Sequence, residues 1–140
     1  MTELALTPVL AHAGLILTVL ASVLHVLIFY MESIAWEGPL ARKTFGGTPE
    51  EARSHAFYAY NQGSYNLFLT VQGLLGAALV WAGSGYAAVA GVALAAFATT
   101  SMLAAAIALA AKSPAHRGAA AKQGALPLLA LVALGLAFLI

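Results

Sequence analysis

Four long apolar runs constrain this chain more than any other feature of its sequence. They cover roughly residues 8–33, 57–82, 86–111 and 124–140, and 62% of the 140 residues are hydrophobic while 8% are charged. A helix needs about 20 mostly apolar residues to cross a bilayer, and inside lipid a helix satisfies its own backbone hydrogen bonds. We therefore predict an all-α integral membrane four-helix bundle that forms a single transmembrane domain over residues 1–140.

The basic residues indicate how this bundle is oriented. With four spans, the segments after the first and third spans lie on the same side of the membrane. These segments, residues 34–56 and 112–123, contain all of the Lys and Arg residues: Arg42, Lys43, Arg53, Lys112, Arg117 and Lys122. Because Lys and Arg concentrate in cytoplasmic segments, we predict that both segments are cytoplasmic loops and that both termini lie outside.

The first of these loops contains local signals for helix ends. Gly38-Pro39 is predicted to end the first helix, and residues 42–47 are predicted to form a basic and aromatic loop. Thr48, Pro49 and Glu51 then match a capping box with proline at the first helical position, which predicts a helix over residues 49–82. Such a helix is about 51 Å long, so its first turns should project beyond a hydrocarbon layer of about 30 Å.

The composition excludes several classes of site. The sequence has no cysteine, which excludes disulfides, thiolate zinc sites and iron–sulfur clusters. Its histidines are too scattered to form a pair at helical spacing, so we predict no metal site and no cofactor. No basic stretch has the clustering that nucleic acid requires.

The polar residues concentrate in one window, residues 31–66, which holds seven of the eleven charged side chains. His25 and Glu32 are seven residues apart and so share one face of the first helix. The second span enters from the same side, which places its amides at similar depth. We predict that the ligand-binding residues are Glu32, His25, Asn61, Gln62, Tyr65, Asn66, Gln72, Arg42, Lys43 and Trp36.

The arrangement of these polar groups leaves alternatives open. Asn61 and Asn66 point about 140° apart on their helix, so the helix is either central in the bundle or borders a polar cavity open to the cytoplasm. The same groups also have structural interpretations. Glu32 is then paired with Arg42 or Lys43, and the amides and His25 join helices by hydrogen bonds.

Four segments carry a resemblance to a known family. They are Tyr30-Met31-Glu32, Trp36-Glu37-x-Pro39, Arg42-Lys43-x-Phe45-Gly46 and Asn61-Gln62-Gly63-x-Tyr65-Asn66. With them the chain resembles the small bacterial membrane proteins of the domain-of-unknown-function family thirteen-hundred-and-four. Ser64 and Leu67 depart from the leucine and glycine expected at these positions. The resemblance implies four helices in a bacterial inner membrane, and it implies no established activity.

Three functions are compatible with the sequence. In the first, a polar site opening to the cytoplasm binds or transports a small molecule, and Glu32 binds a cation or proton. In the second, the chain is a structural or regulatory membrane subunit. In the third, it is a membrane enzyme for a lipophilic substrate, with an architecture similar to membrane glutathione transferases and with Arg53, His55, Asn61 and Tyr65 binding an anionic cosubstrate. The expected partners are the lipid bilayer and further copies of the chain, which would associate through small residues and the apolar fourth span.

Overall fold

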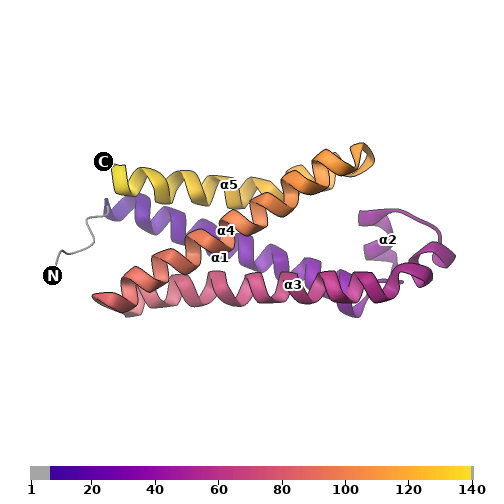
Figure 1. Ribbon diagram of the computed structural model, residues 1–140, viewed down its shortest axis with the longest axis horizontal. Helices are drawn as coiled ribbons and strands as arrows, with labels where there is room; N and C mark the ends of the chain where they lie inside the picture. The colour runs from indigo at the N-terminus through magenta and orange to yellow at the C-terminus, as the bar shows by residue number, and fades with distance from the viewer. Residues whose placement is uncertain (1–6, 140) are drawn as a thin grey trace.

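Four long helices account for most of the molecule. The computed structural model describes residues 7–139, and no strand occurs in that part of the chain. The long helices are α1 (Pro8–Phe29), α3 (Pro49–Ala82), α4 (Tyr86–Lys112) and α5 (Arg117–Leu139), which lie alongside one another (Figure 1). Each belongs to a helical segment that is long and apolar enough to cross a membrane. The prediction of an all-α membrane bundle is confirmed.

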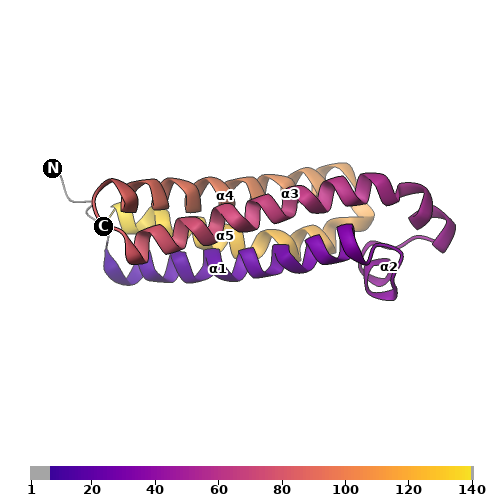
Figure 2. The same ribbon diagram turned by 90° about the horizontal axis from the view of Figure 1, so that it is seen from below.

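Each long helix packs mainly against two neighbours. The order around the bundle is α1, α3, α4, α5 and back to α1, so α1 and α4 lie across a diagonal. Figure 2, turned by 90°, shows that the four long helices extend along one common axis. Because α3 packs mainly against α1 and α4, it is not a central helix surrounded by the others.

Glycines allow α3 and α4 to cross closely. A Cβ atom added at Gly76 would lie 2.6 Å from the backbone nitrogen of Ala95 and 2.8 Å from the carbonyl oxygen of Gly91. A Cβ added at Gly91 would in turn lie 2.7 Å from the carbonyl oxygen of Gly76. Small residues at such crossings bring two backbones into van der Waals contact, which is a main source of helix association in lipid.

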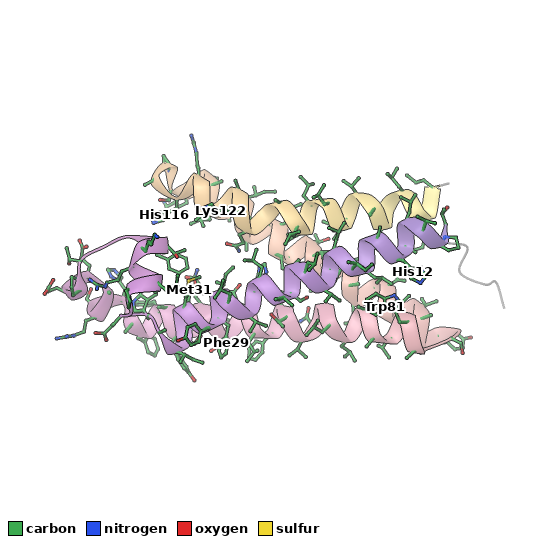
Figure 3. All side chains as sticks on the ribbon, turned by 180° about the vertical axis from the view of Figure 1, so that it is seen from behind. His12, Phe29, Met31, Trp81, His116 and Lys122 are labelled. Atoms are coloured by element: carbon green, nitrogen blue, oxygen red, sulfur yellow. The ribbon has the colours of Figure 1, made fainter. Side chains whose placement is uncertain are left out.

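The two ends of the bundle differ in charge. The short helix α2 (Pro39–Phe45), the start of α3 and the single 3₁₀ turn η2 (Pro114–His116) lie at one end. The start of α1, the end of α5 and the turn between α3 and α4 lie at the other (Figure 1). Figure 3 shows His116 and Lys122 near the first end and His12 and Trp81 near the second. All of the basic residues belong to segments at the first end, which we call the basic end.

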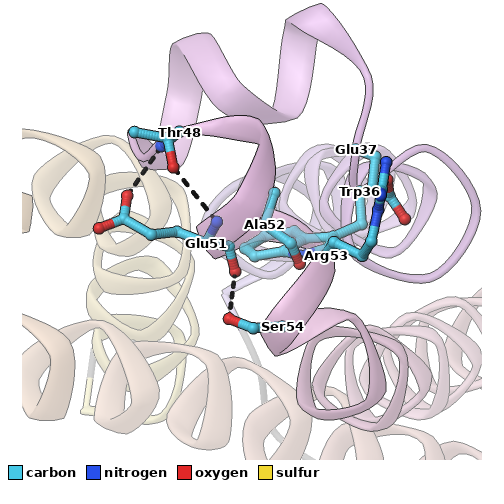
Figure 4. A network of polar contacts seen from close by, with 7 residues as sticks. All are labelled: Trp36, Glu37, Thr48, Glu51, Ala52, Arg53 and Ser54. Carbon is cyan, nitrogen blue, oxygen red and sulfur yellow. Dashed lines mark hydrogen bonds and ion pairs between the residues drawn. The ribbon is translucent and has the colours of Figure 1, made fainter.

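The start of α3 forms as the sequence predicts. The Glu51 N–H donates to the Thr48 hydroxyl at 3.2 Å, and the Thr48 N–H donates to the Glu51 carboxylate at 2.8 Å (Figure 4). Pro49 has no N–H, so this reciprocal pair satisfies two of the three backbone donors that the helix start leaves free. The capping box therefore fixes where α3 begins and confirms the predicted helix over residues 49–82.

The segments between the spans are more helical than predicted. Pro39 occupies the first turn of α2, where its missing N–H costs nothing, and the buried side chain of Ala41 packs against Ile28 and Met31. The prediction of a loop is therefore wrong for residues 42–45. The last helix begins at Arg117, ahead of the apolar run that starts near residue 124, because η2 leads directly into it. Residues 117–123 of the predicted cytoplasmic segment 112–123 are therefore helical.

The orientation of the bundle gives a first prediction. The natural sequence has no cysteine, so single cysteines at the exposed positions Thr44 and Ser84 report the two ends separately. We expect the basic end to face the cytoplasm. In spheroplasts of an expressing bacterium, a membrane-impermeant maleimide should therefore label Ser84→Cys without permeabilisation. It should label Thr44→Cys only after the membrane is permeabilised. The reverse labelling pattern would contradict this orientation.

The close crossing of α3 and α4 gives a second prediction. Gly76→Ala should lower the free energy of unfolding in detergent by about 1–3 kcal/mol, because the added methyl group forces the two backbones apart. Gly135→Ala is the matched control, since a Cβ there meets nothing within 4 Å, and it should leave stability unchanged or raise it by up to about 1 kcal/mol. Equal thermal midpoints for the two variants would disprove the close crossing.

Candidate functional site

The end of α1 is a single turn of π-helix, η1 (Tyr30–Ile34). Its signature is the hydrogen bond from the Ala35 N–H to the Tyr30 carbonyl at 2.8 Å. The wider turn places two successive residues, Met31 and Glu32, in buried positions. Met31 packs beside Ile28, whereas Glu32 faces α3. Single π turns inside helices are frequent at functional sites.

Two amides of α3 hold the carboxylate of Glu32. The Asn66 Nδ2–H donates to Oε2 at 2.7 Å, and the Gln62 Nε2–H donates to Oε1 at 3.2 Å. Glu32 is 4% exposed and Asn66 is 8% exposed. A buried carboxylate is stable only where donors replace the water that it loses, so these two amides are what permit its burial.

The carboxylate of Glu32 has no basic partner within the described residues. The one ion pair in that part of the chain joins Arg53 to Glu37 at 3.5 Å, and both side chains are largely exposed. The alternative in which Glu32 pairs with Arg42 or Lys43 is therefore not what the geometry shows. Among the described residues, the hydrogen bonds to this side chain come from the two amides of α3.

Gly63 allows η1 to approach α3 this closely. A Cβ atom at this position would lie 2.9 Å from the Cβ of Glu32 and 3.0 Å from the backbone nitrogen of Ser33. The Ser33 hydroxyl donates to the Tyr60 carbonyl at 2.9 Å and fastens the same contact. A side chain at position 63 would push η1 away and take Glu32 out of reach of its amides.

Buried polar groups continue from this site into the bundle. The Thr70 hydroxyl donates to the Ser22 carbonyl at 3.1 Å, which links α3 to α1. The fully buried His25 bonds through Nδ1 to the Ala21 carbonyl at 2.8 Å, and its Nε2 has no partner among the described residues. An Nδ1–H that donates to this carbonyl leaves Nε2 as an acceptor.

A cavity of about 500 Å³ lies at the basic end with Glu32 in its wall. This volume lies within the range of small-molecule sites. Because Gly46, Glu51 and His55 in the wall are exposed, the cavity opens to the surface at this end. Its remaining wall residues are Trp36, Phe45, Gly47, Ala52, Tyr58, Ala59, Gln62, Leu109, His116 and Gln123.

Hydrogen bonds across the cavity wall join segments far apart in the sequence. The Trp36 indole N–H donates to the Ala52 carbonyl at 2.7 Å, and the Trp36 and Phe45 rings lie 5.6 Å apart. Figure 4 shows Trp36 beside Ala52. His116 Nε2 bonds to the Phe45 carbonyl at 2.9 Å, and its Nδ1 lies 2.6 Å from the Ser113 hydroxyl. The two hydrogen bonds of His116 are both satisfied when its Nε2 carries the proton and its Nδ1 accepts from the Ser113 hydroxyl.

A second hollow of about 320 Å³ also has Glu32 in its wall. Its other wall residues are Ser33, Ile34, Trp36, Glu37, Ala56 and Tyr60. Glu32 and Trp36 thus line both hollows.

The structure brings some of the predicted site residues together and separates others. Glu32, Gln62 and Asn66 are in direct contact, and Trp36 lies in the same cavity wall. Asn61 and Tyr65 are exposed and line neither hollow, and Tyr65 instead meets Phe68 edge to face. Four further residues stand apart from both hollows: His25 and Gln72, which lie deeper, and Arg42 and Lys43, which lie on α2.

Several cavity residues were not predicted from the sequence. Glu51 was not predicted, and His55 was expected only to bind an anionic cosubstrate. Both share one face of α3 with the predicted Gln62, which lies eleven and seven residues further along, so helical spacing could have detected them. His116 and Gln123 come from the segment after α4, and no local pattern connects them to Glu32. Of the four residues expected to bind an anionic cosubstrate, His55 alone lines the 500 Å³ cavity, while Arg53, Asn61 and Tyr65 lie outside its wall.

Comparison with known proteins identifies a family without an activity. The family model described as a protein of unknown function, DUF1304, matches residues 19–135. The matched region contains η1, α2, α3, α4 and every residue of the cavity wall. No curated protein and no solved structure gives a significant match.

The contact between Asn66 and Glu32 gives a third prediction. Asn66→Ala should lower the free energy of unfolding by about 1–3 kcal/mol, because it removes a hydrogen bond to a buried charged group. Asn61→Ala removes an exposed amide from the same helix and should change stability by less than about 0.5 kcal/mol. Denaturation in mixed micelles, followed by circular dichroism, measures both.

A double-mutant cycle isolates the pair itself. Asn66→Ala should lower the free energy of unfolding by a smaller amount in a Glu32→Gln background. The uncharged amide at position 32 is less costly to bury without the hydrogen bond from Asn66. Strict additivity of the two substitutions would contradict a direct bond between these side chains.

Proposed function

The chain belongs to the DUF1304 family of proteins of unknown function, and from that premise we propose that it binds a small polar molecule within the membrane. The binding site is the cavity of about 500 Å³ at the basic end. The observation that carries the proposal is the Glu32 carboxylate, buried without a basic partner in the wall of this cavity.

The energetics of burial support a functional role for Glu32. An ionisable group within a membrane span is costly and typically marks a ligand, ion or proton site. Amides alone can join two helices by hydrogen bonds, so a structural joint does not require a carboxylate. Glu32 also lines the cavity, which a purely structural joint does not need.

The presence of Glu32 in the walls of both hollows extends the proposal from binding to transport. A ligand that exchanges between the 500 Å³ and 320 Å³ hollows would pass this carboxylate. The larger hollow opens at the basic end, which we propose faces the cytoplasm of a bacterial cell. The wall of the smaller hollow contains the exposed residues Ile34 and Tyr60, so this hollow also reaches the protein surface.

A structural or regulatory subunit is the second candidate, and one observation favours it. The bonds from Gln62 and Asn66 to Glu32 join the end of α1 to α3, which is the role of interhelical polar contacts in many membrane bundles. In that case Glu32 would hold helices together and the cavity would bind nothing.

Native mass spectrometry of the detergent-purified protein separates these two functions and gives a fourth prediction. The wild type should retain a non-protein mass that Glu32→Gln loses. Glu50→Gln is the matched control, because Glu50 is an exposed acid of α3 outside the cavity wall, and it should retain the same mass. The same spectra report the number of subunits and so test self-association. Identical spectra without a retained mass would favour the structural subunit.

A further inference from the structure

We propose that the ligand of this cavity is an organic ammonium ion: a primary or secondary amine with an aromatic or apolar body. The inference rests on the proposed function and specifies the ligand class of the same site. Its basis is the chemistry of the cavity wall, which combines two carboxylates with aromatic rings and lacks any Lys or Arg.

The sign of the charge in the wall selects a cation. Glu32 and Glu51 line the cavity, and none of its described wall residues is Lys or Arg, although every basic residue of the chain belongs to a segment at this end. Arg53 is turned away to Glu37 on the surface. Opposite charges attract strongly where water is partly excluded, so the wall attracts cations and repels anions.

The two histidines of the wall are engaged within the protein. His116 Nε2 lies 2.9 Å from the Phe45 carbonyl and its Nδ1 lies 2.6 Å from the Ser113 hydroxyl, so both ring nitrogens already have partners. His55 Nδ1 lies 2.7 Å from the Glu51 carbonyl, on the exposed side of α3. The acidic side chains of the wall are Glu32 and Glu51.

The geometry at Glu32 selects a cation that carries N–H donors. An ionised carboxylate accepts about four hydrogen bonds, and the described contacts of Glu32 supply two, one to each oxygen. The remaining lone pairs have no donor among the described residues. A primary or secondary ammonium group can donate to them, whereas a quaternary ammonium has no proton to donate and must leave them unsatisfied.

The rest of the wall selects an apolar or aromatic body. Trp36, Phe45 and Tyr58 contribute rings, and Leu109 and Ala59 contribute apolar surface. Ring faces attract cations and also pack against apolar groups. From Glu51 to Gln62 the wall follows α3 for about 16 Å, which is much longer than an ammonium group alone. The site therefore fits an amine with an attached body and not a small inorganic ion.

A bound metal ion is a less suitable occupant. Within residues 7–139 no group of three or more His, Asp or Glu side chains converges as metal ligands would. The Glu32 carboxylate accepts from two amides and the Glu51 carboxylate accepts from the Thr48 N–H, which leaves too few oxygen ligands for a hard cation such as Mg²⁺ or Ca²⁺.

The test uses Trp36 as a reporter and gives a fifth prediction. Trp81 lies at the opposite end of the bundle (Figure 3), so Trp81→Phe leaves one tryptophan, in the cavity wall.

Four probes share a phenyl-alkyl body: 2-phenylethylammonium, its N,N,N-trimethyl analogue, neutral 2-phenylethanol and anionic 3-phenylpropanoate. The primary ammonium should change Trp36 fluorescence saturably. The quaternary and neutral probes should bind at least about tenfold more weakly, as expected for loss of a charge-assisted hydrogen bond. The anion should not bind.

Substitutions in the same background assign the effect to Glu32. Glu32→Gln should weaken binding of the primary ammonium by about tenfold or more, whereas Glu50→Gln should change it by less than about twofold. The comparison among probes is made in protein with Glu32 intact, so it decides the ligand class even where Glu32→Gln fails to fold.

The outcomes separate this inference from the proposed function. Equal affinity for the alcohol and the ammonium, with both weakened by Glu32→Gln, would overturn the ammonium assignment and keep the binding site. Tighter binding of the anion would also overturn it. Absence of any saturable response, together with native spectra lacking a retained mass, would overturn both.

Discussion

The hydrogen bond from Asn66 to Glu32, 2.7 Å long, ties the end of α1 to α3, and the geometry of the basic end follows from it. A carboxylate buried in lipid needs donors within the protein. The π turn directs Glu32 toward α3, and Gly63 lets the two backbones approach. With η1 fixed in this way, Met31 packs against α2, and the end of α2 meets His116. The cavity is the space that these contacts enclose.

Most of the fold is predictable from the sequence, because each apolar run of about 20 residues indicates one helix that can cross the membrane. The capping box at Thr48 likewise fixes the start of α3 by local chemistry alone. The segments between the spans are not predictable in the same way. A proline such as Pro39 can follow one helix or begin the next. Here it begins α2, which the packing of the buried Ala41 stabilises. That packing is a tertiary contact, which no local pattern contains.

The candidate site is predictable only in part. Depth in the membrane correctly groups Glu32 with Gln62 and Asn66, since their helices enter from the same end. Depth does not distinguish a polar residue that faces a neighbour from one at the surface, which is why Asn61 was grouped with them although it is exposed. The π turn also changes which side chains face inward after Phe29, and ordinary helical spacing does not predict that change. His116 joins the wall from a distant segment.

The central claim is that α3 amides hold a buried Glu32 carboxylate beside the cavity, and the side-chain amide resonances of Asn66 test it most directly. A nitrogen–proton correlation spectrum of the micelle-bound protein should show one Asn66 amide proton shifted downfield and protected from solvent exchange. Both properties should be lost in Glu32→Gln, while the exposed Asn61 amide stays unchanged. An Asn66 amide that resembles Asn61 in the wild type, and does not respond to Glu32→Gln, would contradict the account.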